Sequence, residues 1–129
     1  MSYELLQRVK THIVNDGGLL SDYTVRYGKW SDQDFKGNGK VVLFSMQGTS
    51  GETNSVVQYP DVMLTLLSAV RSSRATSQDM LAVVRYLRVN FSVSDVFNMF
   101  PQESVSGPIT LTNGRSMFEL IIRCGVEDH

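Results

Sequence analysis

Two strongly apolar runs, joined by a short polar segment, constrain this chain more than any other feature. They cover residues 40–46 and 55–67, with the polar residues 47–54 between them. Apolar runs of this length, bounded by turn-forming residues, are typical of strands inside a sheet. Pro60 cannot donate a ladder hydrogen bond, so it predicts a bulge, a kink or an edge position. We expect two neighbouring strands at the centre of a β-sheet.

Helical patterns precede and follow these runs. Residues 2–15 have apolar side chains at helical spacing, and the glycine pair at 17–18 predicts the end of that helix. A second helix is predicted over residues 77–90, where Thr76 and Asp79 have the spacing of a capping box. The apolar positions of the two helices are Leu5, Leu6, Val9 and Ile13, and then Met80, Val84, Leu87 and Phe91.

The remaining segments predict further strands and loops. Residues 23–27 and 93–100 have strand-like composition, whereas residues 28–39 and 101–108 are polar or rich in Gly, Pro and Ser and predict surface loops, the first of them mobile. Asn113-Gly114 predicts a two-residue turn between strands at 109–112 and 115–126. In the last strand, Phe118, Leu120, Ile122 and Cys124 alternate onto one face.

Length and composition indicate one domain covering residues 1–129. The chain has 129 residues, of which 42% are hydrophobic and 19% charged, as is ordinary for a globular domain. We predict an α+β fold with a mostly antiparallel or mixed sheet of about four to five strands and two main helices. The expected element order is α-β-β-β-α-(β)-β-β.

Charge and cysteine content disfavour several classes of function. Twelve basic and thirteen acidic residues give a formal charge of −1, which offers no excess positive field for nucleic acid. The apolar runs are too short to span a bilayer, and no secretory leader is recognisable, so neither nucleic acid nor membrane is an expected partner and a cytosolic location is expected. The single cysteine excludes an intrachain disulfide.

The residues predict no catalytic, cofactor or metal site. His12 is expected on the surface of a helix or half-buried, His129 is terminal, and Cys124 is expected in the core. Residues 48–51 superficially resemble a phosphate-binding loop, but they lack its lysine and join two strands. The remaining carboxylates are expected to be solvated loop charges, and they are Asp32, Asp34, Glu52 and Asp61.

Two groups of aromatic and apolar residues leave a choice between core and interface. Tyr23 and Tyr27 are assigned to the core, and Trp30 to an interface with a partner. The apolar side chains near position 100 either cover one face of the sheet or form an exposed patch used in assembly, with the core favoured. They are Phe97, Met99 and Phe100.

The order of motifs resembles the tail terminator proteins of long-tailed phages, of the lambda type. The resemblance covers nearly the whole chain in layout: a helix ending in a double glycine, VVLFSMQGTSGETNSVVQYPDVMLTLLSA, a second helix, and GPITLTNGRSMFELIIRCGV. It implies a phage- or prophage-encoded structural protein without catalysis. Such a protein forms a homohexameric ring on the end of the tail tube, stops tube polymerisation and presents a surface to the head.

The resemblance also implies partners and positions. The expected partners are other copies of the chain, the tail tube protein and a head–tail connector protein, met in the bacterial host cytoplasm and retained in the virion tail. The segment 47–54 corresponds to a variable docking loop, with Glu52 and Asn54 as its polar contacts. Arg71, Arg74 and Arg115 are candidates for contacts with acidic groups across a subunit boundary.

Three alternatives stay open at this point. A head-completion or neck protein would share the small size and ring symmetry but bind on the portal side. A small enzyme or ligand-binding domain would use Tyr27, Asp32 and Asp61 in a cleft, and would be stabilised by its ligand. A component of a secretion apparatus related to phage tails is the third.

Overall fold

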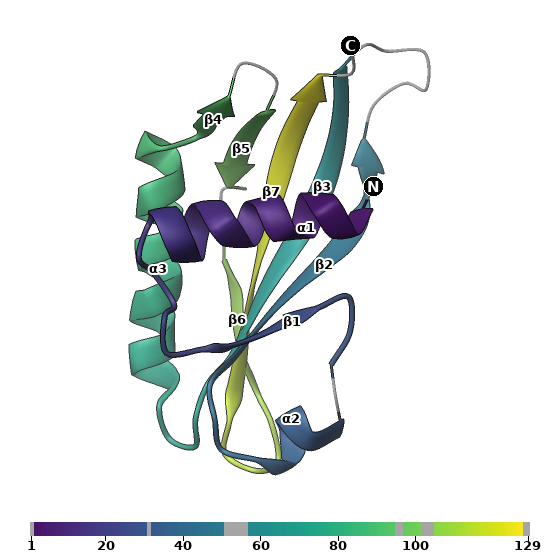
Figure 1. Cartoon of the computed structure of the whole chain (residues 1–129). Coiled ribbons are helices and arrows are strands. Elements are labelled where there is room, and N and C mark those ends of the chain that lie inside the picture. The colour runs from purple at the N-terminus through teal and green to yellow at the C-terminus, as the bar shows by residue number, and fades with distance from the viewer. Residues whose placement is uncertain (1, 31, 51–56, 95–96, 102–104, 128–129) are drawn as a thin grey trace.

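A computed structural model describes residues 2–30, 32–50, 57–94, 97–101 and 105–127. Its elements follow the chain in an order close to the predicted one (Figure 1). They are α1 (Ser2–Lys10), η1 (Thr11–Asp16), β1 (Thr24–Tyr27), α2 (Asp32–Lys36), β2 (Val41–Ser50), β3 (Val57–Leu67), α3 (Ser73–Val89), β4 (Ser92–Ser94), β5 (Phe97–Pro101), β6 (Ser106–Thr110) and β7 (Ser116–Glu127).

The described strands form one mixed sheet in the order β1-β2-β3-β7-β5-β4, and β6 also pairs with β7. Only the β1–β2 pairing is parallel among these described pairs. The predicted α+β class is confirmed, but seven described strands exceed the expected four to five. The stretch 93–100 contributes to two strands, β4 and β5, instead of one, and β6 begins within the expected loop 101–108.

The two apolar runs pair as predicted, with a bulge next to Pro60. Met46 pairs with Val62 and Gly48 with Asp61, so Gln47 is an extra residue in β2. On the other side of β3, ladder pairs with β7 are present at Gln58 and Asp61 but not at the two positions between them. Pro60 has no N–H to donate to the ladder, and the bulge in β2 lies close to it in the sheet. Both observations agree with the effect predicted for a proline inside a central strand.

The N-terminal helix continues from α1 into η1, a π-helical segment, and ends at the predicted glycine pair. Gly18 has φ +67, a conformation that glycine adopts without strain. Gly17 allows close approach, because a Cβ there would lie 2.6 Å from the Ile13 carbonyl oxygen and 2.9 Å from the Tyr86 ring. The glycines therefore end the helix and let it pack against α3.

The start of α3 differs from the capping-box prediction. The helix begins at Ser73, one turn earlier, and its N-cap residue Ser72 makes no side-chain capping bond. Thr76 and Asp79 instead face Tyr23, whose hydroxyl donates to Asp79 Oδ2 at 2.8 Å and lies 3.4 Å from Thr76 Oγ1. Burial is the main cause that raises the pKa of the Tyr23 hydroxyl above its usual value. Tyr23 is thus a core residue, as predicted.

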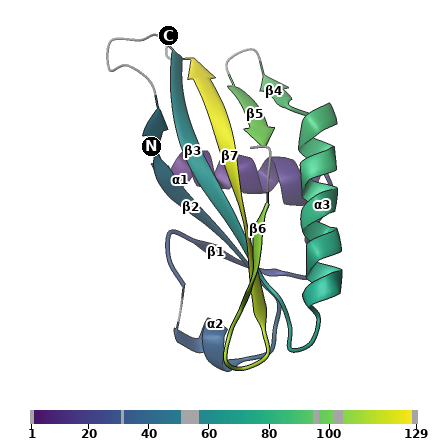
Figure 2. The same ribbon diagram turned by 180° about the vertical axis from the view of Figure 1, so that it is seen from behind.

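The core lies between one face of the sheet and the two longer helices. In Figure 1, α1 crosses the strands and α3 runs along one side of the molecule, and Figure 2 shows the sheet from behind with α1 beyond the strands. Side chains at alternating strand positions share this face. The buried cluster includes Val9 and Ile13 from α1 and η1, Val83 and Leu87 from α3, and Phe44, Leu64, Phe118, Leu120, Ile122 and Cys124 from the sheet.

The closing hairpin is confirmed, but its turn is one residue longer than predicted. Leu111 N–H donates to the Arg115 carbonyl oxygen at 2.8 Å, and Gly114 N–H donates to the Leu111 carbonyl oxygen at 3.1 Å. Gly114 has φ +85, whereas Asn113 is not among the described residues with positive φ. A type I′ turn requires positive φ at both central residues. The loop is therefore a three-residue turn closed by Gly114.

Candidate assembly interface

The segment between β1 and β2 was predicted to be a mobile loop over residues 28–39, but its described residues include a short helix with specific hydrogen bonds. It contains the short helix α2, and Gly37 N–H donates to the Gln33 carbonyl oxygen at 3.1 Å to close it. The Asp34 side chain is buried, so the expectation of a solvated loop charge was wrong for this carboxylate. Its burial is compensated by Arg26 of β1, whose Nε lies 3.1 Å from both carboxylate oxygens.

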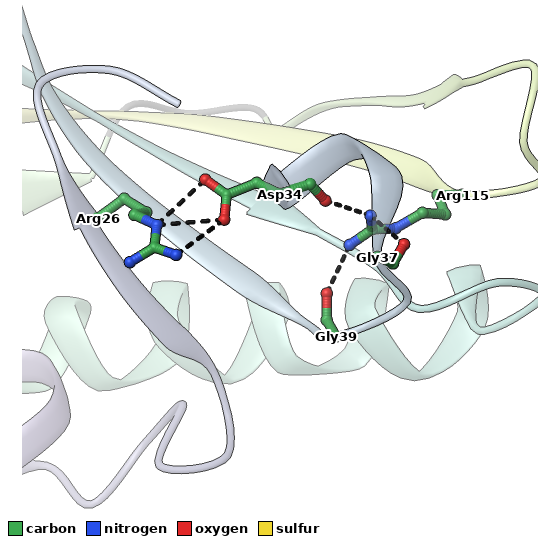
Figure 3. Close-up of polar contacts among 5 residues, drawn as sticks. All are labelled: Arg26, Asp34, Gly37, Gly39 and Arg115. Carbon is green, nitrogen blue, oxygen red and sulfur yellow. Dashed lines mark hydrogen bonds and ion pairs between the residues drawn. The ribbon is translucent and has the colours of Figure 1, made fainter. Parts of the chain in front are cut away.

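Arg115 reaches the same segment from the opposite side (Figure 3). This side chain, at the start of the last strand, is 0% exposed. Its Nη1 donates to the carbonyl oxygens of Asp34 and, at 2.7 Å, Gly37, and its Nη2 donates to that of Gly39. Its Nε donates to the Ser68 carbonyl oxygen at 2.9 Å. One guanidinium therefore joins the α2 segment, the end of β3 and the closing hairpin.

Asp34 connects the two arginines, through its carboxylate to Arg26 and through its backbone to Arg115 (Figure 3). A second bond holds the segment to the turn after β3, since Val70 N–H donates to Asn38 Oδ1 at 2.5 Å. Burial lowers the pKa of Arg115, while the charge of Asp34 raises it. Arginine remains charged inside proteins, and its planar fork can serve several acceptors at once.

The position of Arg115 differs from the surface position expected from the sequence. The described bonds of its side chain all go to backbone carbonyl oxygens of the same chain, and this side chain has no exposed area. A guanidinium that is buried in this way holds segments of its own chain together and has no exposed area with which to contact a neighbouring subunit. The sequence offered little signal for this, because its acceptors are backbone groups, which every residue possesses.

The other sequence-based interface candidates fall into two groups. Trp30 is half-buried just after β1, next to α2, and Arg71 and Arg74 are exposed. Arg74 lies in the first turn of α3, whereas Arg71 precedes the helix, as expected. Glu52 and Asn54 lie outside the described residues, although β2 continues through Ser50 and takes in the first part of the expected docking loop.

The aromatic group near position 100 divides between core and surface. Met99 is buried in the core. Phe100 is exposed and stacks on Phe91 with ring centroids 5.5 Å apart. The side chain of Phe97 lies outside the described residues. The core assignment is therefore confirmed for Met99 and wrong for Phe100.

His12, one of the residues considered for chemistry, has a structural partner. His12 is buried, and its Nε2 lies 2.6 Å from the Asn90 carbonyl oxygen, so it joins the first helix to the end of α3. This is deeper than the predicted surface or half-buried position. Among the described residues, no cluster of three or more His, Cys, Asp or Glu side chains could hold a metal ion.

The cleft of the ligand-binding alternative is not assembled from Tyr27 and Asp61. Tyr27 packs against the core and stacks on Phe44, with ring centroids 6.1 Å apart. Asp61 precedes the buried Val62, so it points to the opposite face of the sheet, where its Oδ1 lies 3.2 Å from Arg123 Nε. The Asp32 side chain lies outside the described residues. Two of the three proposed groups therefore face different sides of the sheet.

Cys124 is a core thiol, as predicted, and its environment gives a testable pH dependence. It is buried, and burial raises its pKa from 9.0 to about 12. The unfolded chain therefore releases this proton first, so the free energy of unfolding should fall as pH rises from about 9 to 12, by at most about 1.4 kcal/mol per pH unit from this group.

Urea unfolding at a series of alkaline pH values would check this, with Cys124→Ala as the control that lacks the thiol. The folded protein should also react with Ellman's reagent at pH 8 only as fast as it unfolds. Fast reaction under native conditions would contradict the buried position.

None of the described helices combines the length and apolar character that crossing a bilayer requires. A search of curated proteins gives no match. The family model described as phage tail termination protein matches residues 2–128, nearly the whole chain. This agrees with the α+β fold and with the resemblance in motif order, and it assigns the chain a structural part in the phage tail. The chain belongs to the phage tail termination protein family.

Proposed function

We propose that this protein forms a ring, expected to be a homohexamer, that binds the end of the tail tube and stops its polymerisation. The match to the tail termination family over residues 2–128 is the observation that carries the proposal. The opposite side of the ring would then present a surface to the head–tail connector protein. Assembly would take place in the bacterial host cytoplasm, and the ring would stay in the virion tail.

The proposed mechanism is steric and involves no catalysis. A ring of identical subunits makes head-to-tail contacts, so each subunit needs two different, complementary patches. Once the ring occupies the tube end, the next tube subunit has no free surface to bind. The free energy for this comes from interfaces alone.

We assign one of the ring patches to the surface around Trp30. Trp30 lies two positions before Asp32, the first residue of α2, and α2 is bonded to Arg26 and Arg115. A half-buried aromatic residue on a fixed support loses little conformational entropy when it is covered by a partner, and tryptophan is enriched among residues that dominate interface energies. Glu52 and Asn54 are proposed as polar contacts of the docking loop.

Trp30→Ala should weaken ring formation by about tenfold or more, because truncation of a central aromatic residue commonly costs upward of 1 to 2 kcal/mol of binding free energy. Sedimentation velocity over a concentration series, with and without tail tube protein, would measure the shift. Lys29→Ala, at the exposed neighbouring position, is the matched control. Equal association of the wild type and the Trp30 variant would remove Trp30 from the interface.

The head-completion alternative predicts a different partner. Immobilised protein would retain the connector protein but not assembled tubes, whereas the proposed terminator retains tube ends. Negative-stain microscopy of tubes incubated with the protein would show directly whether a ring sits at the end.

A further inference from the structure

We draw no further inference here: the strongest candidate, the sheet face opposite the helices, which carries the half-buried Met63 and Ile121 and the exposed Phe100, supports no proposal because nothing in the described part of the structure shows what covers it.

Discussion

Replacement of Arg115 by methionine is expected to lower the free energy of unfolding by about 3–5 kcal/mol. The guanidinium is buried and donates to four backbone carbonyl groups that lie on two segments, the α2 segment and the end of β3. Methionine fills part of the volume but donates no hydrogen bond, so the carbonyl groups of Asp34 and Ser68, whose bonds to Arg115 are buried, would be left without their partner. Each unsatisfied buried group typically costs about 1–3 kcal/mol.

The same substitution should have a local effect that a general loss of stability would not produce. Amide hydrogen exchange between residues 33 and 40 should accelerate under native conditions, because Arg115 is the main described link from α2 to the hairpin. Arg115→Lys should recover only part of the stability, since an ammonium group cannot reproduce the planar fork.

Arg123→Met provides the matched control for Arg115→Met. Arg123 is exposed on β7 and pairs with Asp61, and surface pairs of this kind contribute less than about 1 kcal/mol. Urea unfolding of the three variants would measure the differences. A loss below about 1 kcal/mol for Arg115→Met would contradict the structural role of the guanidinium.

The second large effect is expected for Phe44→Ala, with a loss of about 3–5 kcal/mol. Phe44 lies at the centre of β2, is 0% exposed and stacks on Tyr27 at an interplanar angle of 28°. Alanine would leave a cavity between the sheet and the helices, because the surrounding strands hold their positions. Since a domain of this kind is stable by only about 5–15 kcal/mol, the variant should be marginal at elevated temperature.

Phe91→Ala makes the same chemical change at a different depth and is the control. Phe91 is 42% exposed, and it stacks on Phe100 instead of filling the core. Its loss should be about 1 kcal/mol, the contribution of one exposed aromatic pair. Equal losses for the two phenylalanine variants would contradict the assignment of the core to the helix-covered face.

The features that the sequence predicted are those with a periodic signal. Alternation from Phe118 to Cys124 predicted the buried face of β7, and helical spacing predicted both longer helices. The apolar runs at 40–46 and 55–67 predicted β2 and β3, and the bulge beside Pro60 is one of the three outcomes that this proline predicted. These elements are predicted from patterns that repeat over many residues, so a single residue that departs from the pattern does not change the prediction.

The features that the sequence missed depend on single contacts between distant residues. Arg115 binds acceptors 47 to 81 positions away, and backbone acceptors have no residue-type signature. Thr76 and Asp79 have the spacing of a capping box, but both side chains accept hydrogen bonds from the Tyr23 hydroxyl instead. The helix α3 starts one turn earlier. The short helix α2 is held by Arg26 and Arg115 more than by its own five residues.

The surface candidates show the same limit. Net charge over the whole chain indicated no strongly basic region, yet the helical geometry of α3 gathers three arginines on one face.

If this protein ends the growth of the tail tube, the length of the tubes should depend on its concentration. Purified tube protein from the same genome would be polymerised with increasing amounts of this protein, and tube lengths would be measured by negative-stain microscopy. The tubes should become shorter as the protein concentration rises, with a ring at one end of each. Unchanged lengths and bare ends, with protein that is folded by circular dichroism, would contradict it.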